Sequence, residues 1–158
     1  MTERGSWPYI AFVTASLYSR DILRLAASIP HHERLAAPQA SVEKASPVCG
    51  SRVVVDLALD ERGRVAALGQ EVRACALGQA SAALMGAHVI GRAPVDLAEA
   101  RDALAAYLAG RRDDPGAWPG LSVLSEARAY PARHAAILLA FDAAAEAAAR
   151  AATLASAR

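Results

Sequence analysis

The chain has 158 residues, of which 54% are hydrophobic, 21% charged and only 5% aromatic, and its formal net charge is +1. This length is typical of one domain with a buried core, and we expect a single domain over residues 1–158. A charge this close to neutral argues against a nucleic-acid-binding surface. No apolar run approaches the roughly 20 residues of a membrane span, and no signal-type stretch begins the chain, so a cytoplasmic protein is expected.

The N-terminal part of the chain predicts a helix followed by a long irregular segment. Large apolar residues repeat at helical spacing over residues 16–29, and Pro30 ends that pattern. Residues 35–47 contain two prolines, two serines and few large apolar residues. They predict at most a weak edge strand.

A β-hairpin is predicted in the middle of the chain. From Arg52 to Asp60 large apolar residues recur at every second position (Val53, Val55, Leu57 and Leu59), and residues 65–72 supply a returning strand. Between them, residues 60–63 (Asp-Glu-Arg-Gly) form a turn with glycine where a positive φ is needed.

The second half of the chain predicts helices. A small-residue helix follows Cys75, and Asp96 with Glu99 matches a capping box at the start of another helix. Residues 110–120 form a loop rich in proline and glycine, and an alanine-rich helix begins near Ala135. The predicted fold class is therefore α+β, with a small antiparallel sheet (the hairpin and a weak edge strand) packed against several α-helices.

The two cysteines flank the predicted hairpin. Cys49 stands just before its first strand and Cys75 just after its second. Antiparallel pairing brings such positions to the same end of the hairpin. Thiolates bind iron and zinc, and a helix N-terminus such as that at Cys75 favours an anion. From the residues alone, a metal site, a redox disulfide and two small buried hydrophobic side chains all remain open.

Three segments resemble the ligand motifs of the NifU/IscU/SufU-type iron–sulfur cluster assembly scaffolds. Residues 49–52 (Cys-Gly-Ser-Arg) before an alternating strand are similar to the first motif, and Cys75 before a small-residue helix is similar to the second. Residues 130–139 (Tyr-Pro-Ala-Arg-His-Ala-Ala-Ile-Leu-Leu) resemble the third. The resemblance covers residues 17–148, and the loop at 110–120 resembles the SufU-like branch.

Half of the family's usual ligand set is missing. The family's scaffolds typically use three cysteines and an aspartate, and here Ser51 stands at the aspartate position and Ala136 at the third cysteine position. Cys49 and Cys75 match, and the resemblance implies that they are metal ligands. We expect Ser51 to make a hydrogen bond instead. His134 either enters the site or, as we prefer, marks the start of a helix.

The resemblance implies a scaffold that binds iron or an iron–sulfur cluster, with zinc as another metal. It also implies a cysteine desulfurase and acceptor apo-proteins as partners. The missing donors would come from a second copy in a homodimer or from a partner protein. Alternatively, the chain has lost cluster chemistry and acts as a protein-interaction or regulatory module. We find no phosphate loop or nucleophile motif in the sequence, and we expect no enzymatic activity.

Overall fold

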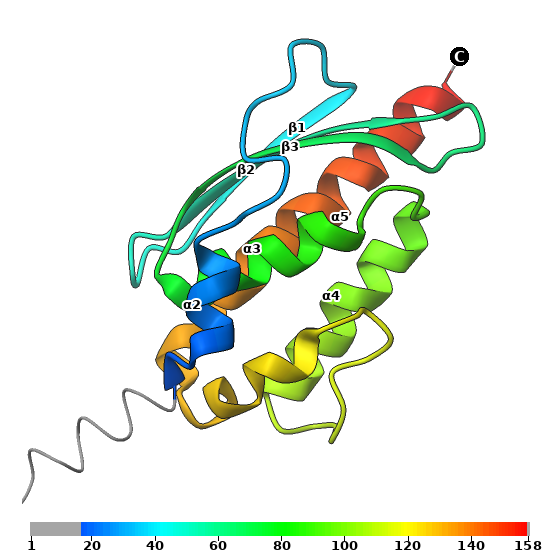
Figure 1. Ribbon diagram of the computed structural model, residues 1–158. Coiled ribbons are helices and arrows are strands. Elements are labelled where there is room, and N and C mark those ends of the chain that lie inside the picture. The colour runs from blue at the N-terminus through cyan, green and yellow to red at the C-terminus, as the bar shows by residue number, and fades with distance from the viewer. Residues whose placement is uncertain (1–16, 158) are drawn as a thin grey trace, which may run out of the picture.

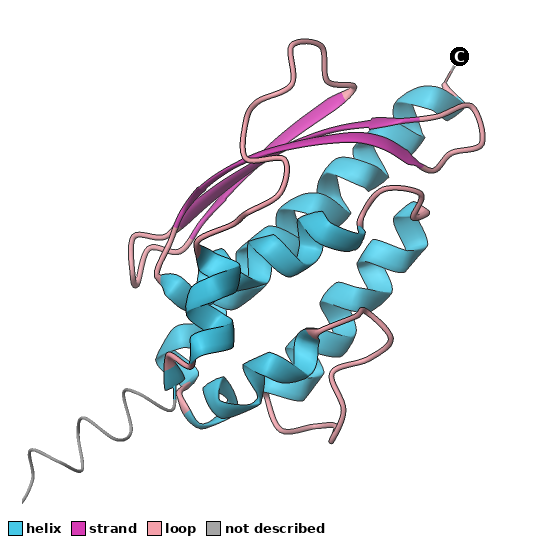
Figure 2. Cartoon of the chain, in the orientation of Figure 1, coloured by secondary structure: helices cyan, strands magenta, loops and turns pink. Residues whose placement is uncertain are grey.

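The computed structural model describes residues 17–157. They form a three-stranded antiparallel sheet in the order β1-β2-β3, with the helices gathered against one face of it (Figures 1 and 2). The strands are β1 (Ala40–Ala45), β2 (Arg52–Leu59) and β3 (Val65–Arg73). The helices are α2 (Arg20–Ala26), α3 (Ala76–His88), α4 (Pro94–Leu108), the 3-10 helices η1 (Leu121–Ala129) and η2 (Pro131–Arg133), and α5 (His134–Ser156). The predicted α+β fold class is confirmed.

The core lies between the sheet and α5. The alternating residues Val53, Val55 and Leu57 of β2 are fully buried on the inner face. Opposite them, α5 presents a row of buried alanines, whose short side chains let the helix axis lie close to the strands. The alanine content of the chain therefore allows close packing of α5 and α3 beneath a small sheet. No helix within residues 17–157 is long and apolar enough to cross a membrane.

Two helix boundaries differ from the prediction. The start of the predicted helix 16–29 lies outside the described residues, and α2 covers only Arg20–Ala26, with the Ser19 hydroxyl accepting a hydrogen bond from the Ile22 amide. Asp96 is not the N-cap of α4. Pro94 begins that helix, since its fixed φ suits the first turn, and the Asp96 carboxylate accepts a 2.9 Å bond from the Ala93 amide.

The segment between α2 and β1 crosses the outer face of the sheet (Figure 1). Its backbone contacts β3, where the Gln70 amide donates to the His31 carbonyl at 2.9 Å. Gly69 lies beneath it, because a Cβ there would stand 2.4 Å from the Glu33 oxygen and 2.9 Å from the Leu35 nitrogen. A side chain at position 69 would therefore displace this segment.

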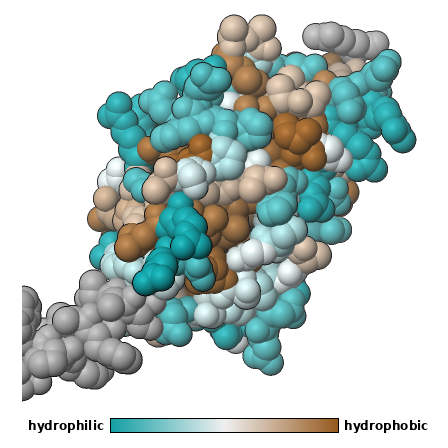
Figure 3. All heavy atoms as spheres, viewed as in Figure 1, coloured by the Kyte–Doolittle hydropathy of each residue, from teal (hydrophilic) through white to brown (hydrophobic). Residues whose placement is uncertain are grey.

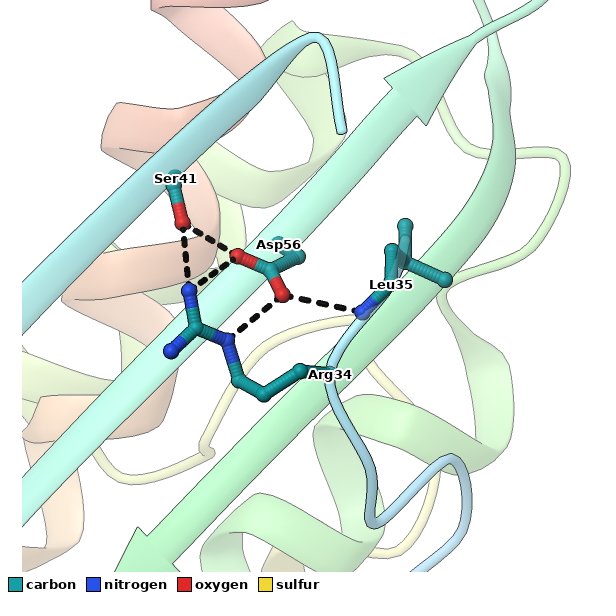
Figure 4. Close-up of polar contacts among 4 residues, drawn as sticks. All are labelled: Arg34, Leu35, Ser41 and Asp56. Carbon is teal, nitrogen blue, oxygen red and sulfur yellow. Dashed lines mark hydrogen bonds and ion pairs between the residues drawn. The ribbon is translucent and has the colours of Figure 1, made fainter. Parts of the chain in front are cut away.

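A buried carboxylate holds the crossing segment in place. Asp56 of β2 has a fully buried side chain, and it accepts bonds from Arg34 Nε at 2.7 Å and Nη2 at 3.1 Å. It also accepts from the Leu35 amide at 3.0 Å and from the Ser41 hydroxyl (Figure 4). All four contacts join β1, β2 and the segment, so Asp56 is the polar anchor of the outer face.

The Asp56 anchor makes stability depend on pH. Burial raises the pKa of this carboxyl group, but the hydrogen bonds from Arg34, Ser41 and Leu35 outweigh burial and leave the pKa below its ordinary value. Because the unfolded pKa is about 3.9, the contribution is complete above that pH and is lost as the pH falls through the folded pKa. Asp56→Asn should lower the free energy of unfolding at pH 7 by about 2 kcal/mol and reduce its decline between pH 6 and pH 3. Urea unfolding at several pH values measures this, and parallel profiles for the two proteins would contradict it.

On the face shown in Figure 3, hydrophobic atoms form several separate areas between hydrophilic side chains. The large apolar side chains that are exposed are dispersed along the described chain. They are Leu23, Val48, Ile90, Val95 and Leu154. Val48 is the most exposed of them, at 82%, and it immediately precedes Cys49.

Candidate functional site

The loop between β1 and β2 fixes the position of Cys49. The Ser46 amide donates to the Ser51 carbonyl at 2.8 Å, and the Gly50 amide donates to the Ser46 carbonyl at 2.9 Å. Gly50 has φ of +73°, a conformation that residues other than glycine rarely adopt. This tight turn places Cys49 near the tip of the loop, where it is exposed.

Cys75 occupies the N-cap of α3, directly after β3. Its backbone is extended, with φ of −63° and ψ of 169°, and its carbonyl accepts a bond from the Gln79 amide at 2.9 Å. The Gln79 side chain donates to the Ala74 carbonyl at 3.0 Å and so fixes the strand-to-helix junction. The Cys75 side chain makes no capping hydrogen bond and is half-buried.

The structure brings both cysteines to one end of the sheet. Arg52 pairs with Arg73 at the last step of the β2–β3 register, and the cysteines lie just beyond that pair. Both line one open depression of about 490 Å³. Its other lining residues are Gly50, Ser51, Val72, Arg73, Ala74 and Gln79. The prediction that Cys49 and Cys75 lie at the same end of the hairpin is therefore confirmed.

Cys49 is an acidic thiol. The Ser46 hydroxyl, then the hydroxyl and backbone of Ser51, lower the pKa of Cys49 to about 7. Ser51 Oγ lies 3.1 Å from the Cys49 sulfur. A lowered pKa favours the thiolate of Cys49 near neutral pH, and the thiolate is the form that reacts and binds metals. The sequence contains one signal for this environment, since serines stand at both ends of a short loop between two strands.

Ser51 and His134 follow the predictions made for them. Ser51 is 4% exposed and hydrogen-bonds to Cys49, as expected for a residue at the aspartate position that lacks a carboxylate. His134 begins α5, and its Nε2 lies 2.8 Å from the Ala127 carbonyl. It lines a different depression, beside Gly110 and Arg128. His134 therefore does not join the two cysteines.

Ala136 lies beside the first turn of α3. It is buried, and its carbonyl oxygen would stand 3.1 Å from a Cβ at Gly78, which would also meet the Ala74 Cβ at 2.7 Å. Ser81 reinforces this contact by donating to the Ile137 carbonyl at 2.6 Å. The start of α5 therefore approaches the turn that carries Cys75.

The depression offers two thiols and no third strong ligand. Within residues 17–157, no cluster of three or more His, Cys, Asp or Glu side chains is arranged to hold a metal ion. A tetrahedral iron or zinc site takes about four donors. Two donors would therefore have to come from outside the described residues. Arg73 also lines this depression.

Two solved structures are similar to this chain over most of its length. The chain is 35% identical to a nitrogen-fixing NifU-like protein (N-terminal) from Brucella abortus, with a TM-score of 0.84 over 89% of this chain and 98% of that one. A putative iron–sulfur cluster assembly scaffold protein for the SUF system from Fervidobacterium islandicum is 20% identical, with a TM-score of 0.78 over 85% of this chain and 98% of that one. This second likeness is one of fold. No protein-family model and no curated protein sequence matches the chain.

Proposed function

The chain belongs to the NifU/IscU/SufU-type family of iron–sulfur cluster assembly scaffolds, and on that premise we propose that it binds iron or an iron–sulfur cluster as cargo through Cys49 and Cys75. The observation that carries this proposal is the position of both thiols in one open depression. Zinc, another ion that thiolates bind, would occupy the same two sulfurs. The SufU-like branch, inferred from the loop at 110–120, stays a prediction.

The remaining donors come from a second copy of this chain or from a partner protein. The exposure of Cys49 supports either source, because another protein surface can reach its sulfur. A symmetric dimer would combine two thiolates from each copy, which equals the four donors of a [2Fe–2S] cluster. In the second case a partner protein completes the ligand set and the cargo is held only transiently.

A cysteine desulfurase as sulfur donor, acceptor apo-proteins and a cytoplasmic location complete the proposal. Ala136 stands where the family carries its third cysteine, so this chain cannot receive sulfur at that position. The role proposed here is to hold cargo and pass it on, with no catalytic residue in this chain.

Anaerobic reconstitution with ferric iron and sulfide tests the proposal. The wild-type chain should become coloured, and Cys49→Ala or Cys75→Ala should abolish the visible absorbance, because neither leaves a pair of thiolates. A matched control is Cys49→Ala combined with Ser28→Cys, which restores the number of thiols at an exposed position of the α2–β1 segment. This control should stay colourless. Sedimentation of the coloured sample separates a bridged dimer from a monomer.

A protein-interaction module without metal is the second candidate function. The missing third and fourth ligands favour it. Metal analysis of freshly purified protein, together with the reconstitution, discriminates the two functions. A chain that stays colourless and free of metal with both thiols reduced would contradict the cargo proposal and favour the module.

A further inference from the structure

Two arginines lie directly opposite each other at the cysteine end of the sheet. Arg52 of β2 pairs with Arg73 of β3 at the last step of the register. The adjacent pair, Val53 and Val72, is buried on the inner face, so both arginines project from the outer face, where both are exposed. Like charges in direct cross-strand opposition destabilise a sheet, so this opposition does not serve the stability of the fold.

The charges of the two arginines are compensated differently. Arg52 forms an ion pair with Glu43 of β1. Arg73 forms no ion pair with any residue that the structure describes. The crossing segment reaches the outer face at Asp56 and Gly69, four residues away along both strands, or about 13 Å. The guanidinium group of Arg73 is therefore an uncompensated cation on an open part of this face.

The position of Arg73 connects this cation to the candidate site. Arg73 lines the same open depression as Cys49 and Cys75. A group that supplies the missing donors has to enter across this lining, because the depression itself offers two thiols and no third strong ligand. A protein surface that carries a carboxylate beside its donor would therefore meet Arg73 as it enters.

We propose that the donors missing from this chain arrive on an acidic surface of a partner protein, a carboxylate of which pairs with Arg73 beside the cysteines. This inference rests on the proposed function and selects between the two sources of donors given there. A second copy is disfavoured, because a two-fold axis through both depressions would bring four guanidinium groups close together, those of Arg52 and Arg73 from each copy. Nucleic acid is disfavoured as well, since Glu43 and Glu71 follow the arginines on the same face and would repel a row of phosphates.

Thiol–disulfide exchange with charged peptides tests this docking without any metal. The probes are the peptides Asp-Asp-Cys-Asp-Asp and Ser-Ser-Cys-Ser-Ser, each with a 2-thiopyridyl group on its cysteine sulfur. A thiolate of the chain attacks the peptide sulfur, a mixed disulfide forms and pyridine-2-thione leaves, and the absorbance of the thione gives the rate. The ratio of the acidic to the neutral rate should fall about 2- to 5-fold in Arg73→Gln, because one exposed ion pair is lost. Arg73→Lys keeps the charge and should restore the ratio.

The matched control is Arg62→Gln, which removes an equally exposed charge in the β2–β3 turn at the other end of the sheet. It should leave the ratio unchanged. In about 1 M NaCl the wild-type ratio should approach that of Arg73→Gln, because salt screens exposed charges. Equal ratios for Arg73→Gln and the wild type would overturn the proposal. Stronger protection of the cysteines by an oligothymidylate than by hexaaspartate would also overturn it.

Reconstitution with iron and sulfide separates this inference from the proposed function. Arg73→Gln retains both thiols and should become as strongly coloured as the wild type. A colourless wild-type chain whose exchange rates still depend on Arg73 would support the acidic partner and overturn the cargo role. A coloured wild-type dimer in sedimentation would overturn the choice of a partner protein, because the second copy would then supply the donors.

Discussion

Ser51→Asp combined with Ala136→Cys should strengthen Zn²⁺ binding by about 100-fold or more, because the site would gain a carboxylate and a third thiolate. Both positions adjoin the segments that carry the two cysteines. Ser51 already contacts the Cys49 sulfur at 3.1 Å, and Ala136 lies against the turn of α3 that follows Cys75. Competition with a chromophoric chelator measures the gain.

The control for this double variant is the adjacent alanine. Ala135 is exposed whereas Ala136 is buried, so Ser51→Asp with Ala135→Cys adds the same two groups with the thiol directed elsewhere. Only a small gain is expected from the control. Equal affinities for the two double variants would mean that the start of α5 does not contribute a ligand position in this chain. Loss of the ligands would then be accompanied by a change in the shape of the site.

The hairpin and the meeting of the cysteines could be predicted because both follow from local rules. Alternation over residues 52–60 and the turn at Gly63 determine the strand pairing. Once those strands pair, residues just before the first and just after the second must lie at one end. The helix after Cys75 is equally local, since small residues and helix formers follow it without a break.

The polar contacts around the sheet could not be predicted because they depend on a segment without regular structure. Asp56 stands at an outward-facing position of an alternating strand, which the sequence alone assigns to solvent. It is buried because Arg34 and Leu35 arrive from another part of the chain. The environment of Cys49 depends in the same way on tertiary structure, since only the closed loop brings the Ser51 hydroxyl to 3.1 Å from the Cys49 sulfur.

Gly69→Ala should destabilise the protein by about 2–3 kcal/mol, because the new Cβ would meet backbone atoms that cannot rotate away. The nearest are the Glu33 oxygen at 2.4 Å and the Leu35 nitrogen at 2.9 Å. Ala67→Ser adds an atom to the same strand and, by its alternation with position 69, to the same outer face. It should change the free energy of unfolding by less than about 0.5 kcal/mol. Urea unfolding measures both. If Gly69→Ala lowered the free energy of unfolding by no more than the control does, the crossing segment would be able to move away without destabilising the protein.

Gly69 and Asp56 should also act as one unit. They are paired in the β2–β3 register. The absence of a side chain at Gly69 leaves space for the Leu35 amide, which donates a hydrogen bond to Asp56. A segment displaced by Gly69→Ala has already lost part of its bonding to Asp56. Adding Asp56→Asn should therefore cost at least about 0.5 kcal/mol less in the Gly69→Ala background than in the wild type. Additive effects would contradict this coupling. Because both residues lie in mid-strand, metal binding by the folded fraction should be the same in all four proteins of the cycle.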